Sequence, residues 1–347
     1  MSGIRLPVLT LGLAATALVL LAPVSPAIAQ GAQSRDIQTV LNETYVKFKT
    51  LQEGKNADYI PALAKVDPKI FGIALVTTDG KVYTAGDVKF EVSIQSISKV
   101  FTLAKVIEEQ GPDHIEKTIG VDATGMRFNS IVSVEFSQKV LGGPEMNSLV
   151  NPGAIATTSM LKGSSRPEIW NSLLSFYSAF AGRPLAVNQE VFKSEAETNQ
   201  RNQAIGYLMY AYGYIKANPM QATDIYTEQC SVSVNARDLA TMAATLADGG
   251  KNPVSGKQVM TAKNVPYVLA VMATAGLYDD SGKWLYHTGL PAKSGVGGGI
   301  IAVAPGKFGI AVISPPLDEA GNSVRAQKAI TEIVARLHAN PYAVSPS

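Results

Sequence analysis

Strand-like sequence occurs in two regions of the chain that lie far apart, and this separation constrains the fold more than any other feature. In the first region, FGIALVTTDGKVYTAG alternates on either side of Asp79-Gly80, which is a strong signal for a β-hairpin. In the second, GGGIIAVAP and KFGIAVISPP are joined by a tight Pro-Gly turn. Both regions can bury their apolar side chains if they join one sheet. The sequence therefore predicts a two-layer α+β fold with one antiparallel sheet, built from residues of about 70–95 and 285–315.

The sequence between the two strand regions is mostly helical. Between about 115 and 275, apolar residues recur at helical spacing in 165–181, 202–216 and 235–248, with Gly or Pro between these segments. Further amphipathic helices are predicted at 36–51 and 323–338, outside the strand regions. The chain shows no internal repeat and no long linker. Residues 30–347 are therefore predicted to form one domain, with helices flanking the sheet and a helical subdomain.

The first 29 residues have the pattern of a secretory signal. They carry a single charge, Arg5, followed by an apolar stretch at 6–21 and by PVSPAIAQ, in which Ala27 and Ala29 fit a small-x-small cleavage rule. We expect cleavage after Ala29 and a secreted or periplasmic protein without membrane association. The alternative is that the segment is retained as a membrane anchor.

Composition and the remaining motifs exclude several classes of protein. Of 347 residues, 46% are hydrophobic and 17% are charged, as in globular proteins, and the formal net charge of +2 argues against nucleic-acid binding. The three histidines, His114, His287 and His338, have no acidic partners at ligand spacing, so neither a metal site nor a Ser-His-Asp triad is expected. The only cysteine, Cys230, is predicted to be a buried, unreactive thiol. No glycine-rich phosphate loop opens a helix, so no cofactor is expected.

The segment SIQSISKVF, at 93–101, follows the first strands and opens a helix predicted at 96–110. Ser96 and Lys99 are three residues apart and therefore project from the same face of this helix. A serine hydroxyl becomes a nucleophile when a base takes its proton, and lysine is such a base only when it is neutral. Burial and the positive end of the helix dipole both favour the neutral amine. The free N–H of Ser96 at the helix start can also bind an oxyanion, so the segment predicts acyl-transfer chemistry.

The SxxK pattern alone is weak, because a second copy occurs at 159–162 and because a serine before a helix is often only an N-cap. A second motif strengthens it: Lys293-Ser294-Gly295 stands just before the apolar strand IIAVA. Serine β-lactamases and penicillin-binding proteins carry SxxK where a helix opens after a strand, together with K-T-G or K-S-G on a neighbouring strand. The two motifs, in this order and setting, favour an enzyme of that architecture.

Many longer segments resemble one family over nearly all of residues 50–340. They are GKNADYIPALAK at 54–65, SIQSISKVF at 93–101, ATGMRFNS at 123–130, NPGAI at 151–155, RNQAIGYLM at 201–209, YTEQCSVSV at 226–234, MAATLADGG at 242–250 and GLPAKSGVGGGI at 289–300. Together they resemble the serine-dependent glutaminases of the bacterial and mitochondrial type. The resemblance implies a β-lactamase-like fold, a homodimer or homotetramer, and cofactor-free hydrolysis of L-glutamine to L-glutamate and ammonia.

The resemblance also implies a role for individual residues. Ser96 would attack the side-chain amide of glutamine and form a glutamyl ester, with Lys99 as its base. The remaining positions are Tyr59 and Tyr278 as active-site tyrosines, Asn151, Glu195, Asn202 and Tyr226 as substrate contacts, Val296 as the second oxyanion N–H, and Lys293, Ser294 and Gly295 as support. Glu195 suits the α-ammonium of an amino acid. Without the resemblance, Glu195 would be interpreted as a solvated charge, Asn202 as a helix N-cap and the tyrosines as core aromatics.

The sequence departs from the family pattern in two places near the expected pocket. The chain has Asn151-Pro152-Gly153 where the family usually has Asn-Ala-Gly, and the segment at 131–146 differs from the usual charged loop. These departures could alter the substrate range.

Two other functions stay open: a β-lactamase, carboxypeptidase or esterase of the same architecture, and a non-catalytic amino-acid-binding relative. An S-D-N triplet would support the former, and the nearest pattern here is Ser233-Val234-Asn235.

Overall fold

The computed structural model describes residues 1, 3 and 26–344, and in the helix that begins at Pro26 it describes side chains from Ile37 onward. The chain divides into two units, Met1–Asp36 and Ile37–Ser347, and the site described below lies in the second. Of the predicted signal at 1–29, the structure describes only residues 1, 3 and 26–29, the last four at the start of α1 (Pro26–Phe48), so the signal stays a prediction. None of the described helices combines the length and the apolar character needed to span a bilayer.

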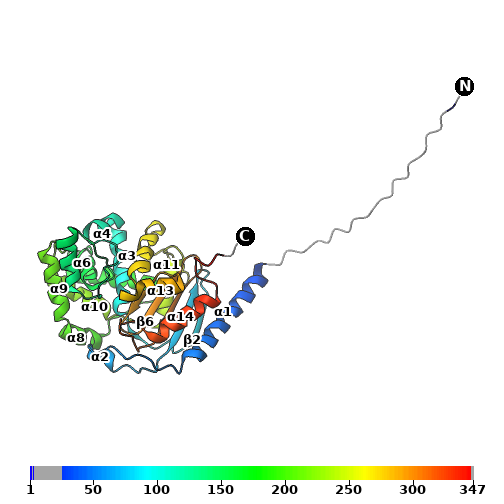
Figure 1. Ribbon diagram of the computed structural model, residues 1–347, viewed down its shortest axis with the longest axis horizontal. Helices are drawn as coiled ribbons and strands as arrows, with labels where there is room; N and C mark the ends of the chain where they lie inside the picture. The colour runs from blue at the N-terminus through cyan, green and yellow to red at the C-terminus, as the bar shows by residue number, and fades with distance from the viewer. Residues whose placement is uncertain (2, 4–25, 345–347) are drawn as a thin grey trace. The chain divides into compact units, whose positions relative to one another are not determined.

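The predicted sheet is confirmed, with strands from both ends of the chain side by side (Figure 1). Its order is β2-β1-β7-β6-β5, and every neighbouring pair is antiparallel. The strands are β1 (Gly72–Thr77), β2 (Val82–Gly86), β5 (Ala292–Gly295), β6 (Gly299–Ala304) and β7 (Phe308–Ile313). The hairpin between β1 and β2 turns at Gly80, whose φ of 84° lies in the left-handed region that favours glycine. Both predicted turns, at Asp79-Gly80 and Pro305-Gly306, therefore join antiparallel neighbours.

Both faces of the sheet are buried, because alternate residues of each strand enter different apolar clusters. Ala74 and Val76 of β1 belong to the cluster that includes α11 (Ala236–Ala247), whereas Ile73 and Leu75 pack with α14 (Val324–Arg336) and α1. This two-residue alternation is that of a pleated strand. Gly309 of β7 lies directly under α11, where a Cβ atom would come within 2.0 Å of the Ala244 nitrogen. The absence of a side chain there lets α11 pack close against the sheet.

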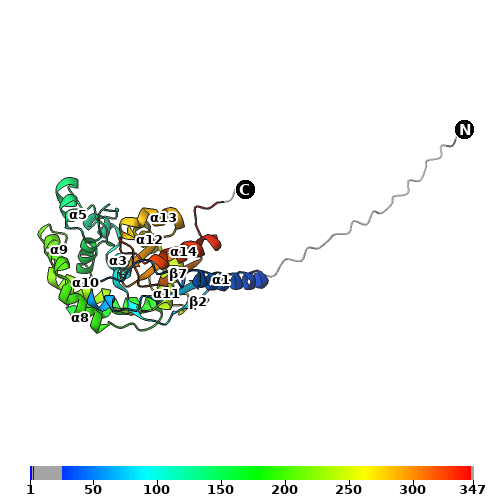
Figure 2. The same cartoon turned by 60° about the horizontal axis from the view of Figure 1, so that its bottom comes forward.

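Most elements between about 115 and 275 are helices. In both views, α8, α9 and α10 lie together, at the end of this unit away from α14 (Figure 1, Figure 2). The helices are α2 (Pro61–Ala64), α3 (Ser98–Gln110), α4 (Pro112–Thr118), α5 (Ile131–Phe136), α6 (Asn151–Ser159), α7 (Arg166–Ala181), α8 (Gln189–Thr198), α9 (Gln200–Ala211), α10 (Pro219–Cys230), α12 (Val265–Ala275) and α13 (Ser281–Thr288). A short two-stranded sheet joins β3 (Val92–Ser93) to β4 (Ser233–Val234).

Helix boundaries follow the local capping chemistry. Ser165 and Asn235 cap α7 and α11 with side-chain hydrogen bonds, as the predicted starts at 165 and 235 require. The predicted helix at 202–216 is shifted: α9 ends at Ala211, because Gly213 adopts a left-handed φ of 77° that no α-helix continues. The helix predicted to begin at Ser96 also begins differently. Ser96 lies in a 3₁₀ turn, η1 (Gln95–Ile97), and α3 proper starts at Ser98.

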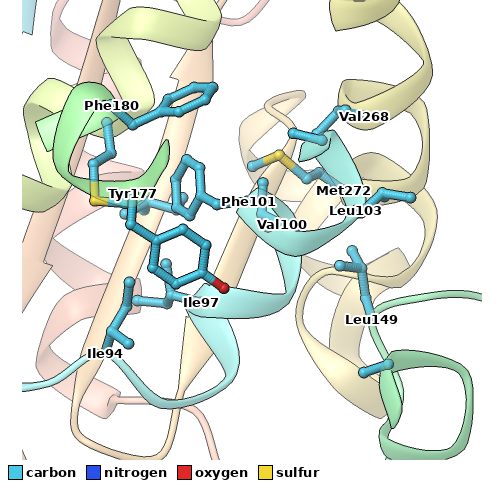
Figure 3. Packing of buried hydrophobic residues seen from close by; sticks show 14 of the residues in the cluster. Ile94, Ile97, Val100, Phe101, Leu103, Leu149, Tyr177, Phe180, Val268 and Met272 are labelled. Atoms are coloured by element: carbon cyan, nitrogen blue, oxygen red, sulfur yellow. The ribbon is translucent and has the colours of Figure 1, made fainter. Parts of the chain in front are cut away.

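Helix α3 is anchored in the centre of the main apolar cluster (Figure 3). The Phe101 ring centroid lies 5.0 Å from that of Phe180 and 6.0 Å from that of Tyr177, both on α7. Val100, Leu103 and their neighbours on the other sides of α3 are fully buried as well. Close packing on all sides fixes the position of the helix. The residues at its start are therefore held rigidly.

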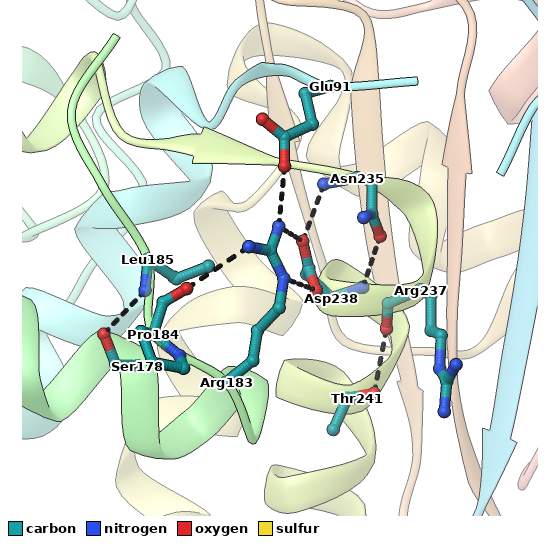
Figure 4. Close-up of polar contacts among 9 residues, drawn as sticks. All are labelled: Glu91, Ser178, Arg183, Pro184, Leu185, Asn235, Arg237, Asp238 and Thr241. Atoms are coloured by element: carbon teal, nitrogen blue, oxygen red, sulfur yellow. Dashed lines mark hydrogen bonds and ion pairs between the residues drawn. The ribbon is translucent and has the colours of Figure 1, made fainter. Parts of the chain in front are cut away.

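An ion-pair cluster fixes the chain just before β3 (Figure 4). Arg183, after the end of α7, donates from Nε to Asp238 Oδ1 at 2.7 Å and from Nη2 to Glu91 Oε1 at 2.9 Å. Asp238 lies in the first turn of α11 and also closes the capping box with Asn235. One guanidinium thus ties α7, α11 and the approach to β3 together. β3 then leads directly into the turn that carries Ser96.

Candidate active site

A sharp turn presents Ser96 at the junction of β3 and α3. Gln95 has a φ of 50°, in the left-handed region that is uncommon for a residue other than glycine. Its carbonyl oxygen accepts a hydrogen bond from Ser98 Oγ at 2.6 Å, and the N–H of Ile94 donates to Val232 O at 2.8 Å. These bonds hold the turn in place on both sides of Gln95. In the following 3₁₀ turn, side chains three residues apart eclipse one another, so Ser96 and Lys99 share a face.

Lys99 is buried, with 1% of its surface exposed. Its Nζ donates a hydrogen bond of 2.6 Å to Asn151 Oδ1 and lies 5.6 Å from the centre of the Tyr226 ring. Burial lowers the pKa of Lys99 to about 8, against the opposing charges of Cys230 and Glu195. A neutral amine is therefore accessible near neutral pH, as a base for Ser96 requires.

Asn151 joins four helices at the site. Its Oδ1 accepts from Tyr226 Oη at 3.1 Å as well as from Lys99, and its Nδ2 donates to Asn202 Oδ1 at 2.9 Å. The four residues come from α3, α6, α9 and α10, so the predicted substrate contacts converge. Pro152 lies in the first turn of α6, where a missing N–H breaks no helical hydrogen bond. The departure from the family pattern at this position therefore leaves α6 intact.

Glu195 is a buried carboxylate on α8, with 7% of its surface exposed, and not a solvated charge. Its Oε2 accepts a hydrogen bond of 3.1 Å from Gln95 Nε2, which lies 3.1 Å from Ser93 Oγ as well. Burial raises the pKa of Glu195 to about 7, against the hydrogen bond from Gln95 and the charge of Lys99. A cation placed beside this carboxylate would be strongly favoured. Gln95 was not predicted from the sequence, where only its position before Ser96 singles it out.

Tyr278 and the KSG segment form the opposite wall. Tyr278 has a φ of 53°, and its Oη donates to Ser294 O at 3.4 Å. Burial raises the pKa of Tyr278 to about 12, while a hydrogen bond with the Ser96 side chain opposes this shift. Lys293 Nζ lies 4.1 Å from the centre of the Tyr278 ring and donates to Gly276 O at 2.9 Å and Ser294 O at 2.8 Å. Burial, and then the charge of Lys99, hold the pKa of Lys293 well below its usual range.

The other two residues of the KSG segment face opposite ways. A Cβ atom on Gly295 would lie 2.9 Å from Ile94 O, so only glycine allows β5 to approach the turn before Ser96 this closely. Ser294 is fully buried, and its Oγ has no hydrogen-bond partner among the described residues. It is a neighbour of Lys293 and Gly295 in a strand, so its side chain points to the other face of the sheet. Its contact with the site is made by its carbonyl oxygen.

Val296 directly follows β5, and no backbone acceptor of its N–H is found in the described part of the chain, while Ser96 lies in the 3₁₀ turn at the start of α3. Free N–H groups at a helix start and beside a strand end can serve as an oxyanion hole. Tyr59 lies at the edge of the site, and 55% of its surface is exposed. The pKa of Tyr59 is nevertheless raised, first by burial of its hydroxyl and then by Tyr278 and Glu195. Tyr59 is thus close enough to Tyr278 and Glu195 to interact with them electrostatically.

Two other predictions concern the thiol of Cys230 and a metal site. Cys230 is 1% exposed, so its predicted burial is confirmed, and burial raises the pKa of its thiol to about 12, as is typical of unreactive thiols. Within the described residues, no group of three or more His, Cys, Asp or Glu side chains is arranged to hold a metal ion.

Comparison with known proteins places this geometry in a family. A family model described as Glutaminase matches residues 54–342. The chain belongs to the glutaminase family. It is 53% identical over 313 residues to a glutaminase of Colwellia psychrerythraea, covering 90% of this chain and 99% of the relative. The resemblance seen in the sequence is thereby confirmed.

Comparison with solved structures points to the same family. A probable glutaminase, ybaS, superimposes with a TM-score of 0.87 at 46% identity, covering 90% of this chain and 99% of that chain. A probable glutaminase from Bacillus subtilis, solved with 6-diazo-5-oxo-L-norleucine, gives a TM-score of 0.77 at 29% identity, with 93% and 99% covered. The predicted α+β fold of the serine β-lactamase-like class is therefore confirmed for this member of the glutaminase family.

Proposed function

We propose that this protein hydrolyses the side-chain amide of L-glutamine through a covalent seryl intermediate. Ser96 Oγ attacks the amide carbon while Lys99 Nζ takes the hydroxyl proton. The tetrahedral oxyanion is bound by the N–H groups of Ser96 and Val296. Its collapse breaks the C–N bond, and the nitrogen leaves as ammonia with a proton returned from Lys99. Water then attacks the glutamyl ester and gives a proton to Lys99, which passes it to Ser96 Oγ as the ester C–O bond breaks, so that glutamate and the free Ser96 are released.

The substrate's amino-acid end would be bound by the buried polar residues. Glu195 offers a carboxylate to the α-ammonium, and Gln95 holds that carboxylate by a bond of 3.1 Å. Asn151, Asn202 and Tyr226 supply amide and hydroxyl groups that can donate to the α-carboxylate. Tyr59 and Tyr278 would hydrogen-bond the substrate or relay protons. Buried polar groups left unpaired by a smaller amide would discriminate against it.

The observation that carries this proposal is the setting of Lys99. It is buried one helical turn after Ser96 and hydrogen-bonds a neutral amide rather than a carboxylate. Such a setting favours the amine over the ammonium. Membership of the glutaminase family and the relative solved with 6-diazo-5-oxo-L-norleucine support glutamine as the substrate.

The test is an assay of ammonia released by the purified mature chain. L-Glutamine is compared with L-asparagine, with a γ-glutamyl compound and with a chromogenic β-lactam. We expect turnover of glutamine and none of the β-lactam, and Ser96→Ala should lower kcat by three or more orders of magnitude, roughly the cost of losing a nucleophile. Mass spectrometry of the enzyme treated with 6-diazo-5-oxo-L-norleucine should place the label on Ser96. A label on another residue would contradict the mechanism.

We further propose that residues 1–29 are removed as a secretory signal and that the mature chain self-associates as a dimer or tetramer. The signal pattern ending at Ala29 supports the first proposal, and the family resemblance supports the second. N-terminal sequencing of protein exported by its host should begin at Gln30. Light scattering coupled to size exclusion measures the mass in solution, and a monomeric mass would overturn the second proposal.

A further inference from the structure

A segment that crosses the site is held at both ends by a single buried arginine. This segment, residues 50–67, is called the strap below; it contains Tyr59 and the short helix α2. The chain enters the strap at Lys49 and leaves it at Pro68. Arg325, the second residue of α14, contacts the backbone at both of these places.

All the hydrogen bonds of the Arg325 guanidinium go to uncharged acceptors. Nε donates to Ser314 Oγ at 2.8 Å, and Nη1 lies 3.3 Å from Lys49 O and 3.4 Å from Lys69 O. Nη2 donates to Pro68 O. Arg325 is 3% exposed, and burial lowers its pKa. The charges that face it, on Tyr45, Asp67 and Asp87, oppose that shift without hydrogen-bonding the guanidinium in the described structure.

Such a placement is costly and therefore calls for a physical explanation. A buried cation without a hydrogen-bonded carboxylate loses much of its solvation energy. Its position in the first turn of α14 is also unfavourable to a positive charge. The cost of burying this cation is offset by its planar guanidinium, whose five N–H donors reach the backbone at both ends of the strap at once.

The strap connects these ends to two parts of the site. Ala57, Ile60 and Leu63 of the strap pack in one apolar cluster with Val296, whose N–H is the proposed oxyanion donor. On the other side, the N–H of Ala62 lies 3.3 Å from Oγ of Ser194, the residue before Glu195, and Figure 1 shows α2 beside α8. The middle of the strap pairs with Leu317 through Lys55, at 3.1 Å and 2.8 Å. A cavity of about 220 Å³ remains between the strap and the Val296 loop.

We propose that Arg325 is a positioning residue for the active site: by closing both ends of the strap, it sets the place of Tyr59 at the edge of the site and the packing on Val296. The proposal rests on the proposed function for the role of these two residues. Ends that are fixed leave the strap few conformations, and part of the strap faces a pocket of about 220 Å³. Small displacements of positioned groups are expensive in catalysis.

The test is a double-mutant cycle between Arg325→Lys and Tyr59→Phe. Lysine keeps the charge but cannot bond both ends at once. We expect Arg325→Lys to lower kcat/KM by about 10- to 100-fold in the wild-type background and by much less in the Tyr59→Phe background, because Arg325 acts through Tyr59. Arg336→Lys, on the same helix in a surface ion pair with Glu43, is the matched control and should leave kcat/KM unchanged.

A purely structural role gives a different result. If the role of Arg325 is only structural, Arg325→Lys lowers the melting temperature, and its effect on kcat/KM adds to that of Tyr59→Phe. Such additivity would overturn the proposal. Ser314→Ala removes one hydrogen bond of the Arg325 guanidinium and keeps the arginine itself. This variant therefore tests the proposal if Arg325→Lys does not fold. In Ser314→Ala, amide hydrogen exchange at 55–66 should rise above wild type. Unchanged exchange there overturns the proposal even if the wild type proves inactive on glutamine, whereas inactivity of the wild type overturns only the proposed function.

Discussion

Lys99 Nζ lies 2.6 Å from Asn151 Oδ1, so the amine that would activate Ser96 is oriented by a neutral amide. The same amide oxygen accepts from Tyr226, and the amide nitrogen is tied to Asn202. The acceptor is therefore fixed in direction by three partners. An amide accepts from a neutral amine without stabilising the ammonium as a carboxylate would. The orientation of Lys99 is thus controlled by one side chain, whereas burial lowers its pKa.

Asn151→Asp should shift the pH dependence of activity to higher pH. A carboxylate at this position stabilises the ammonium of Lys99 and raises its pKa from about 8 by roughly one to three units. Activity that needs the neutral amine then appears only at higher pH. The measurement is kcat/KM for glutamine between pH 6 and about 10.5. Asn151→Ala is the control. It loses the bonds of the amide to Lys99 and Asn202 without adding a carboxylate, so its activity should fall without the alkaline shift.

The wild-type enzyme should show a rise in kcat/KM with pH across the neutral range. Lys99 must lose its proton, with a pKa of about 8, and Glu195 must be ionised to bind the α-ammonium, with a pKa of about 7. Both changes increase activity as pH rises. The two groups interact, so the two apparent values belong to the pair. A profile that is flat or falling between pH 6 and 8 would show that these groups do not limit the reaction.

Much of the fold could be predicted from the sequence because its signals are local. Asp79-Gly80 between alternating residues predicts a hairpin wherever it occurs, and the capping residues Ser165 and Asn235 mark their helix starts independently of the rest of the chain. The spacing of Ser96 and Lys99 places both side chains on one face whether the turn is 3₁₀ or α-helical. These features depend on backbone geometry alone.

The features that could not be predicted depend on tertiary contacts. A left-handed φ at Gln95 is stabilised by its bonds to Ser98 and to Glu195, and the sequence around it contains no glycine to mark it. Arginine is rarely buried, so the position of Arg325 beneath the strap has no sequence signal. The burial of Glu195 likewise follows from the packing of α8, since its own segment is polar.

Gln95→Ala should weaken substrate binding and raise the pKa of Glu195 further. The hydrogen bond from Gln95 Nε2 to Glu195 is the largest influence that lowers this pKa, against burial. Without it, the carboxylate ionises at higher pH, and the lower limb of the kcat/KM profile should move above pH 7. KM for glutamine rises while kcat changes less. Gln95→Gly, which removes the same bond but relaxes the left-handed backbone, should show the same shift with a smaller loss of stability. An unmoved limb in both variants would show that Gln95 does not control Glu195.

Glu195→Gln should make the folded protein more stable above pH 7 while weakening the binding of glutamine. In the unfolded chain Glu195 ionises near its ordinary value of 4.5, whereas in the folded protein its pKa is about 7. Between these values the folded state holds a proton that the unfolded state releases, so rising pH removes stability from the wild type, on the order of 3 kcal/mol above pH 7. Glutamine, which never ionises, avoids this loss.

The melting temperatures of wild type and Glu195→Gln should therefore be close at pH 4.5 and diverge as pH rises to 8, with the variant the more stable. At pH 8 the same variant should have a KM for glutamine raised by about 100-fold or more, since it cannot pair with the α-ammonium. Glu332→Gln, a surface carboxylate paired with Lys47, is the control and should show neither effect. A variant that is less stable than wild type at pH 8 would mean that Glu195 is already paired in the free protein. The binding role would then belong to another group, because a carboxylate with a partner has little to gain from the substrate.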